Sequence, residues 1–119
     1  MNCPKCKVEM EKVSYQSVEV DRCTRCGGIW FDLLEHKRLK GLPGAEALDV
    51  GSPDRQAALD ALEKVDCPVC QTRMTRLADV RQPHIWYESC PVCSGVFFDA
   101  GEFRDYKEET LFELIKTWL

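Results

Sequence analysis

Cysteine spacing is the strongest constraint that this sequence places on its fold. All eight cysteines fall into four Cys-x-x-Cys pairs, with none left over: Cys3/Cys6, Cys23/Cys26, Cys67/Cys70 and Cys90/Cys93. Two residues between thiols let a tight turn direct both sulfurs at one ion, and two such turns complete a tetrahedron. The pattern therefore predicts two metal sites, each formed by four cysteines.

The separation between the paired turns favours zinc as the metal. The inner cysteines are separated by 16 residues in the first half and by 19 in the second, as is typical of two turns that share a zinc ion. Soft sulfur ligands without histidine or carboxylate predict a closed tetrahedral site, with zinc in a structural role. Iron also fits four sulfurs, so the choice between zinc and iron stays open at this point. Each ion would contribute about 10 to 16 kcal/mol of apparent binding energy to folding.

Two other uses of the cysteines compete with metal binding. Four disulfides would suit a small secreted scaffold, but the doubled Cys-x-x-Cys spacing makes this reading the weaker one. A reactive dithiol needs a thioredoxin-like βαβ context, which the sequence does not show. The chain also opens directly into a cysteine motif without a signal-peptide pattern, so we expect it in the cytoplasm.

The chain contains one unit written twice, since residues 3–40 can be laid over residues 67–107. Matching positions include Pro4/Pro68, Met10/Met74, Gly28/Gly95, Trp30/Phe97, Phe31/Phe98, Asp32/Asp99 and Glu35/Glu102. Duplication within 119 residues predicts two small modules instead of one core. On this reading, replacing Cys3 or Cys67 by serine unfolds only the module that carries it.

The predicted fold is a small, metal-stabilised α+β fold. We expect two tandem four-cysteine units with short β-hairpins, each followed by a helix. In the first unit, Val13–Tyr15 and Val18–Val20 alternate as hairpin strands; in the second, Ile85–Tyr87 forms the return strand, with a loop near residues 81–83. The Asp-x-x-Glu motifs at Asp32 and Asp99 predict helix starts.

These elements divide the chain into three parts. Residues 1–40 form the first unit with a short helix, about 33–40, that ends at Gly41. Residues 41–66 form an acidic linker with one helix, about 54–64, after Ser52 and Pro53. Residues 67–119 form the second unit with a long helix that runs to the chain end.

Several side chains near the metal turns have two readings. The aromatics Trp30, Phe31, Phe97 and Phe98 could stack on bases, but their position directly after a metal turn favours core packing. His36 and His84 lie in charged or loop segments without a metal motif, so we expect both on the solvated surface. A cluster of Lys5, Lys7, Arg22 and Arg25 could bind phosphates; compensation of the negative metal–thiolate site is favoured.

Net charge weakens the case for a nucleic-acid partner. The formal net charge is -4, and each loaded four-thiolate zinc site adds about -2, which brings the chain to about -8. Such a field repels phosphate backbones. In the second unit, apolar residues Val69 and Val92 replace the first unit's basic turn residues, which favours a protein contact.

The last segment is amphipathic, and its apolar face is wider than one small module can bury. Its apolar positions are Leu111, Phe112, Leu114, Ile115, Trp118 and Leu119, with Glu109, Glu113 and Lys116 opposite. This face could dock on the linker helix or the other unit, or it could form a homodimer or partner interface through Leu111, Leu114, Ile115 and Trp118.

The doubled motif resembles a known family. The pattern C-P-x-C, a strand pair, then C-x-x-C-[GS]-G-[IV]-[WF]-F-D-x-x-E is similar to the transcription-factor-IIB-type zinc-ribbon family of small bacterial proteins, over residues 3–40 and 67–104. The resemblance implies that the two units are tandem zinc ribbons, a zinc-ribbon fold in which all eight cysteines are ligands. Its name points to transcription, although one fold hosts many functions. Ser94 departs from the pattern, because Gly27 occupies that place in the first unit.

The sequence therefore favours a non-enzymatic protein-interaction adaptor, linked to transcription or another macromolecular assembly. The alternative is a nucleic-acid-binding regulator that uses the basic first ribbon. A thiol redox enzyme is least favoured, because no phosphate loop, nucleophile motif or open metal site is present. No apolar run approaches the roughly 20 residues that span a bilayer, so we expect no membrane partner.

Overall fold

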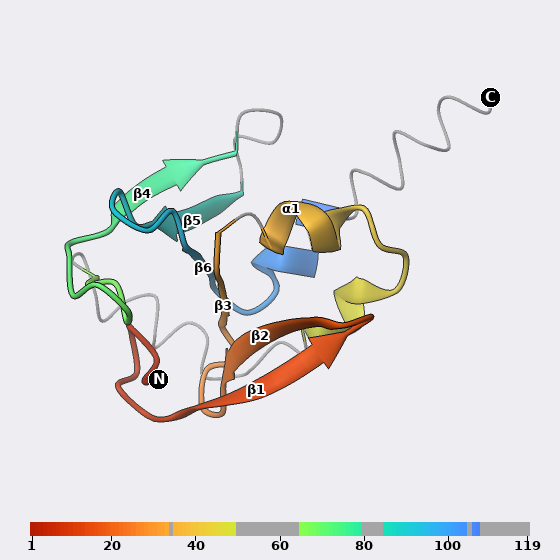
Figure 1. Ribbon diagram of the computed structural model, residues 1–119, viewed down its shortest axis with the longest axis horizontal. Helices are drawn as coiled ribbons and strands as arrows, with labels where there is room; N and C mark the ends of the chain where they lie inside the picture. The colour runs from red at the N-terminus through yellow and green to blue at the C-terminus, as the bar shows by residue number, and fades with distance from the viewer. Residues whose placement is uncertain (34, 50–64, 80–84, 105, 108–119) are drawn as a thin grey trace.

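One antiparallel sheet of six strands forms the centre of the protein, as the computed structural model describes it for residues 1–33, 35–49, 65–79, 85–104 and 106–107. The strands lie in the spatial order β1-β2-β3-β6-β5-β4 (Figure 1). Their bounds are β1 Met10–Tyr15, β2 Val18–Cys23, β3 Ile29–Phe31, β4 Thr75–Ala78, β5 Trp86–Ser89 and β6 Val96–Phe98. The described helical segments are α1 Glu35–Lys40, the 3-10 helix η1 Ala45–Leu48, and residues 102–104 and 106–107.

Both predicted hairpins are present. Gln16 and Ser17 join β1 to β2 with φ angles of 47° and 69°, the left-handed conformation that a two-residue type I′ turn requires. In the second repeat β4 pairs with β5, but the return strand begins at Trp86 and not at Ile85. The predicted loop at 81–83 lies outside the described residues.

The two repeats join at the middle of the sheet, where β3 pairs with β6. The register is Ile29 with Phe98, Trp30 with Phe97, and Phe31 with Val96. Ile29 therefore faces the counterpart of Phe31, and Phe31 faces the counterpart of Ile29, while Trp30 faces its own counterpart, Phe97. The pairing relates the two repeats by an approximate two-fold axis that passes through the Trp30–Phe97 pair.

One face of the sheet packs against the helical segments and forms a core that both repeats share. The buried members of this cluster, which we call the helix-side core, are Val18, Val20, Ile29, Phe31, Leu39, Ala45, Leu48, Ile85, Val96, Phe98, Phe103 and Tyr106. The prediction of two modules without a common core is wrong, because the β3–β6 pairing brings both apolar faces under one helical layer. The boundaries at residues 40 and 66 stay a prediction.

The Asp-x-x-Glu motifs lie where helical segments begin. The Asp32 backbone N–H donates to Glu35 Oε1 at 2.9 Å, and α1 begins at Glu35, two residues later than the sequence predicted. In the second repeat, the Glu102 N–H donates to the Asp99 carbonyl at 3.0 Å, at the start of the helical residues 102–104. The predicted linker helix and the end of the C-terminal helix lie outside the described residues.

Asp49, at the end of the first half, anchors to the second repeat. Its fully buried carboxylate accepts from the backbone N–H groups of Gly101, at 2.8 Å, and Arg104, at 3.0 Å. A carboxylate at the first turn of a helix satisfies donors that have no intrahelical partner. Asp49 therefore caps the helical segment of the other repeat.

Lys107 makes the reverse connection. Its side chain is 4 % exposed, and its Nζ donates to three backbone carbonyls at the end of α1, those of Leu39, Lys40 and Leu42, at 2.8 to 2.9 Å. A cation at a helix C-terminus satisfies carbonyls that the helix leaves free. The second repeat thus caps the helix of the first.

His36 is buried, contrary to the sequence prediction. The side chain on α1 is 6 % exposed, and its ring centroid lies within 6.1 to 6.3 Å of those of Phe31, Tyr87, Phe98 and Tyr106. Three of these four aromatics, Tyr87, Phe98 and Tyr106, belong to the second repeat. The charged neighbours of His36 in the sequence could not indicate that another repeat covers this side of the helix.

Candidate metal centres

The first four-cysteine group lies at the base of the β1–β2 hairpin. Cys3 and Cys6 lie in the turn before β1, Cys23 is the last residue of β2, and Cys26 lies in the turn towards β3. Their four Sγ atoms all lie within 4.8 Å of one another. The structure therefore brings the four predicted ligands of the first site together.

The second group repeats this arrangement at the base of the β4–β5 hairpin. Cys67 and Cys70 precede β4, Cys90 follows β5 directly, and Cys93 lies in the turn towards β6. The four Sγ atoms again lie within 4.8 Å of one another. All eight predicted ligands are thus divided between two groups, as the spacing indicated.

The sulfur positions fit a zinc ion. In a regular tetrahedron with zinc–sulfur bonds of about 2.3 Å, neighbouring sulfurs are about 3.8 Å apart. The Sγ atoms of Cys3 and Cys26 are 3.9 Å apart, and those of Cys67 and Cys93 are 3.7 Å apart. Four sulfurs fill the tetrahedron and leave no position for a water, so each group could hold zinc as a closed structural ion.

All four Cys-x-x-Cys turns share one backbone conformation. The residue after the second cysteine has a positive φ in each turn: Lys7 64°, Gly27 76°, Gln71 63° and Ser94 63°. Its N–H donates to the carbonyl of the first cysteine at 2.9 to 3.1 Å. The change from Gly27 to Ser94 therefore leaves the turn intact in the second repeat.

Backbone N–H groups point at the sulfurs inside these turns. In the first group, Cys3 Sγ accepts from the Cys6 N–H at 3.3 Å, and Cys23 Sγ accepts from the Cys26 N–H at 3.3 Å. In the second group, Cys67 Sγ and Cys90 Sγ accept two such bonds each, at 3.3 to 3.5 Å. Hydrogen bonds to a sulfur favour its thiolate form, which is the form that binds metal.

Without a cation, four of the sulfurs resist ionisation, because the pKa is raised at Cys6, Cys26, Cys67 and Cys70. Burial and the neighbouring cysteines raise the pKa of Cys6 to about 12 and that of Cys70 to about 12. For Cys90, burial acts in the same direction, but the N–H groups of Cys93 and Val92 outweigh it and lower the pKa to about 7. A divalent ion supplies the positive charge that holds four thiolates together, and its binding releases protons.

The metal turns cover the second face of the sheet and form a second apolar cluster. The buried members of this metal-side core are Cys3, Met10, Cys23, Cys26, Trp30, Val65, Cys67, Met74, Cys90 and Phe97. Trp30, Phe31, Phe97 and Phe98 are all 0 % exposed. The prediction that these four aromatics serve the core is confirmed, and they offer no face for base stacking.

The sequence analysis placed Lys5 in a surface cluster of basic residues, but the structure buries its side chain. Its Nζ lies 2.8 Å from Glu88 Oε1 and 2.8 Å from Asp99 Oδ2, and it is 5.8 Å from the centre of the Phe97 ring. Burial acts to lower the pKa of Lys5, but Asp99 and Glu88 outweigh it and raise the pKa. A residue of the first metal turn thus pairs with two carboxylates of the second repeat.

The rest of the predicted basic cluster is divided. Arg22 pairs with Glu11, with 2.9 Å between Nη2 and Oε1, and donates to the Leu48 carbonyl. Lys7 and Arg25 are exposed. The four cations therefore do not form one exposed patch, because tertiary contacts occupy Lys5 and Arg22.

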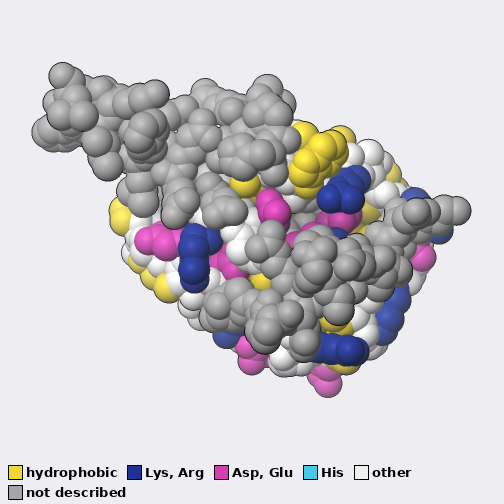
Figure 2. Space-filling model, turned by 180° about the vertical axis from the view of Figure 1, so that it is seen from behind, with side chains coloured by type: hydrophobic (Ala, Val, Ile, Leu, Met, Phe, Trp, Pro, Cys, Tyr) yellow, Lys and Arg dark blue, Asp and Glu magenta, His cyan; other side chains and the backbone are white. Residues whose placement is uncertain are grey.

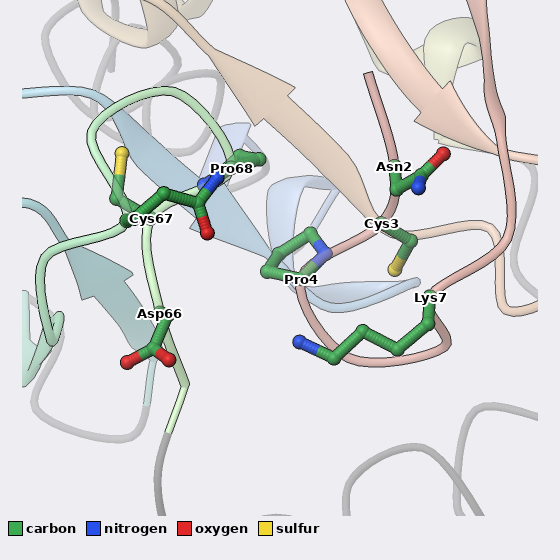
Figure 3. A pocket seen from close by; sticks show the side chains of 8 residues that line it. Asn2, Cys3, Pro4, Lys7, Asp66, Cys67 and Pro68 are labelled. Atoms are coloured by element: carbon green, nitrogen blue, oxygen red, sulfur yellow. The ribbon is translucent and has the colours of Figure 1, made fainter.

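A cleft of about 230 Å³ separates the first metal turns of the two repeats. Figure 3 shows Pro4 and Pro68 facing each other across it, with Lys7 and Asp66 on opposite sides. Asp66 Oδ1 accepts from Arg73 Nε at 2.9 Å. The cleft lies close to the approximate two-fold axis that relates the repeats, since equivalent residues line both walls.

The fold and the two sulfur sites define a small metal-stabilised protein with a duplicated ribbon. The chain belongs to the TFIIB-type zinc-ribbon family, described as a transcription factor zinc-finger, whose match covers residues 2–41 and 66–109. One match per repeat agrees with a tandem arrangement. No curated protein and no solved structure matches the chain. Among the described residues, no helix has the length and apolar character needed to cross a membrane.

Proposed function

We propose that this protein is a non-enzymatic, zinc-binding adaptor in which two zinc ribbons and their helices, joined by a linker with one helix, present a surface to a protein partner. The observation that carries the proposal is the closed character of both sites: eight thiolate ligands, five of them buried, leave no metal position for a substrate. Zinc in such a site stabilises the fold and does not activate water. The same set of reduced thiols favours the cytoplasm.

Exposed apolar side chains on the second repeat support a protein partner. Val69 and Val92, at the tips of the second repeat's metal turns, are 52 % and 67 % exposed. Trp86 on β5 is 43 % exposed, and the Arg76 guanidinium lies 5.3 Å from its ring centre. Tryptophan and arginine are enriched at the energetic centres of protein interfaces. The sequence adds the apolar positions Leu111, Leu114, Ile115 and Trp118.

A transcription-related assembly is the setting that the family name suggests for this adaptor. The competing proposal, a nucleic-acid-binding regulator, rests on Lys7 and Arg25 after the loss of Lys5 and Arg22 to internal pairs. On the face shown in Figure 2, the basic and acidic side chains of the described residues are interspersed. Together with a net charge of -4, this distribution favours the adaptor.

The adaptor is tested by capture followed by direct binding. Zinc-loaded full-length protein is used to capture partners, which are identified by mass spectrometry and purified. Each partner is then titrated against the wild type and against the variants named below. We expect the double variant Val69→Lys/Val92→Lys or Trp118→Lys to weaken binding at least about tenfold. Lys7→Ala serves as the matched surface control and should bind as the wild type does.

Nucleic acid is tested in parallel at low salt. The adaptor proposal fails if duplex or single-stranded DNA binds at 50 mM salt, if binding weakens steeply with added salt, and if Lys7→Ala/Arg25→Ala abolishes it. A thiol oxidoreductase activity that survives with both zinc ions bound would also overturn it.

A further inference from the structure

The two four-cysteine groups occupy equivalent places in the duplicated fold, so their cysteines can be compared one by one. In both groups the first cysteine of each pair is buried and accepts a backbone N–H. The second cysteine of the leading pair, Cys6 or Cys70, is partly exposed in both. The groups differ at their last cysteine, which is Cys26 in the first group and Cys93 in the second.

Cys26 is enclosed, whereas Cys93 is open to solvent. Cys26 is 1 % exposed, and its Sγ accepts the N–H of Gly28 at 3.4 Å. Cys93 is partly exposed, and among the described residues no N–H donates to its Sγ. A hydrogen bond stabilises a thiolate, and a more stable thiolate is a weaker nucleophile. Cys93 therefore keeps the reactivity that burial and the Gly28 N–H remove from Cys26.

The second group thus has two accessible sulfurs, one on each of its turns. Cys70 lies in the turn before β4 and Cys93 in the turn towards β6, and their Sγ atoms lie within 4.8 Å of each other. In the first group, Cys6 has no accessible sulfur beside it, because the other three cysteines are buried. Oxidation to a disulfide needs one thiolate that reacts with the oxidant and a second thiolate next to it. Only the second group offers both to solvent.

The turn that carries Cys93 is also attached less firmly. In the first group, Thr24 Oγ1 donates to the Glu9 carbonyl at 3.2 Å and so ties the second metal turn to the segment before β1. Pro91 takes the place of Thr24 in the second group, and its side chain has no donor. The approach of Cys93 to Cys70 therefore breaks no bond of this kind.

Charge also separates the two groups. Four thiolates and one divalent ion carry a net charge of about -2, and nearby cations stabilise the ionised sulfurs. Lys7 and Arg25 lie in the turns of the first group, where the second group has Gln71 and Val92. The second group therefore keeps more of its negative charge, which makes its thiolates better nucleophiles towards a neutral oxidant.

We propose that Cys70 and Cys93 form an oxidation site, at which a hydroperoxide converts both thiolates into a disulfide and thereby releases the second zinc ion while the first group stays intact. The inference goes beyond the adaptor proposal and does not depend on it, since it concerns the chain and its metal alone.

The reaction balances with hydrogen peroxide as the oxidant. One thiolate attacks the peroxide, the O–O bond breaks, and the sulfur becomes a sulfenic acid, while the displaced hydroxide takes a proton and leaves as water. The other thiolate attacks this sulfur, an S–S bond forms, and a second hydroxide takes a proton and leaves as water. Two electrons pass from the sulfurs to the peroxide. The two thiolates that remain are too few to complete a tetrahedral site.

Zinc release from the zinc-loaded full-length protein tests the site. Hydrogen peroxide is added in the presence of a chromogenic chelator, remaining thiols are alkylated after denaturation, and disulfides are identified by fragmentation in a mass spectrometer. We expect one equivalent of zinc to leave at least about tenfold faster than the other. A Cys70–Cys93 disulfide should form at the same rate, while all four cysteines of the first group are still alkylated. Without peroxide, the chelator should remove neither ion on this timescale.

Histidine variants test the two sulfurs without removing the metal, because three cysteines and one histidine also form a zinc site. Native mass spectrometry first confirms that each variant holds two zinc ions. We expect Cys93→His and Cys70→His to slow the peroxide-dependent release of the faster equivalent about tenfold or more. Cys6→His, at a partly exposed ligand of the first group, is the matched control and should leave this release unchanged.

Three results would overturn the proposal. The first is that both ions leave at the same rate, or that the first group loses its ion first. The second is that the earliest disulfide joins any pair other than Cys70 and Cys93. The third is that Cys93→His or Cys70→His, loaded with two zinc ions, releases zinc as fast as the wild type. None of these readings involves a partner, so this inference and the adaptor can fail separately.

Discussion

Trp30 of the first repeat lies against the backbone of Gly95 in the second, so closely that a Cβ on Gly95 would overlap the indole ring. The relation is reciprocal, because a Cβ on Gly28 would overlap the ring of Phe97. The two aromatics face each other across the β3–β6 pair. The central aromatic side chain of each repeat thus packs directly on a glycine of the other repeat.

Replacing either glycine by alanine should destabilise the whole protein. Gly95 does not have a positive φ, so the effect of Gly95→Ala is steric. Trp30 is 0 % exposed and has no room to move away. We expect a loss of about 1 to 3 kcal/mol in the free energy of unfolding, measured by urea denaturation at fixed free zinc.

Gly41 provides the control for this measurement. A Cβ on Gly41 would meet nothing nearer than the Arg38 carbonyl at 3.7 Å, an ordinary contact. Gly41→Ala should therefore change the stability by less than about 0.5 kcal/mol. Equal effects of Gly41→Ala and Gly95→Ala would show that the close aromatic contact does not matter.

Replacing Lys5 by methionine should be costly, because it leaves Glu88 and Asp99 buried without their cation. Both side chains are 7 % exposed. Removing one partner of a buried ion pair costs about 3 to 5 kcal/mol. The triple variant Lys5→Met/Glu88→Gln/Asp99→Asn should recover part of this loss in the same urea experiment.

An exposed ion pair provides the comparison for the loss of stability expected of Lys5→Met. Arg73 and Asp66 form a pair whose side chains are 56 % and 46 % exposed, and such pairs contribute about 0 to 1 kcal/mol. If Lys5→Met costs no more than Arg73→Met, the buried network does not stabilise the contact between the repeats.

Zinc binding at the two sites should be coupled. Cys3→Ser removes a ligand from the turn that carries Lys5, and the loosened turn no longer neutralises Glu88, two residues before Cys90. We expect the affinity of the second site for zinc to fall about tenfold or more, a coupling of about 1.4 kcal/mol. Competition with a chelator, followed by native mass spectrometry, measures the affinity of the remaining site.

The reciprocal variant, Cys67→Ser, should weaken the first site in the same assay. An unchanged affinity of the intact site in both variants would restore the picture of two independent modules that the repeat in the sequence suggests.

His36 should make the stability depend on pH. Burial, followed by the charge of Lys37, lowers the pKa of His36 to about 4, against an ordinary value of 6.5. The unfolded chain binds the proton more readily, so stability is fully retained above pH 6.5 and falls as the pH drops towards 4. Between pH 7.5 and 5.5 we expect a loss of about 1 kcal/mol, allowing for partial solvent screening.

His36→Phe isolates this contribution, since phenylalanine suits the four surrounding rings and Nδ1 of His36 has no hydrogen-bond partner. Free zinc is held constant so that proton competition at the thiolates is the same in both proteins. Parallel stability curves for wild type and variant would mean that His36 titrates normally in the folded state.

The sequence was informative wherever a short motif determines local structure. The four Cys-x-x-Cys pairs predicted both groups of ligands, and the alternation around Gln16 and Ser17 predicted the first hairpin. The aromatics after each metal turn predicted the core. In each case the information lies within a few residues, or in a spacing that is typical of one metal geometry.

What the sequence could not predict is how the repeats meet. Three apolar residues in β3 and three in β6 carry no signal that they pair with each other, and this long-range contact creates the common cores. The burial of Lys5 and His36 follows from that contact, because their partners come from the other repeat. Charged neighbours in the sequence made both residues look exposed.

The hydrogen bonds of Lys107 have a consequence for synthesis. The carbonyls that end α1 receive their donor from Lys107, a residue that is synthesised 65 positions after Leu42. A nascent first ribbon can bind its zinc while the chain is still attached to the ribosome. The end of α1 nevertheless stays frayed until the second repeat has been synthesised, because its donor is still missing.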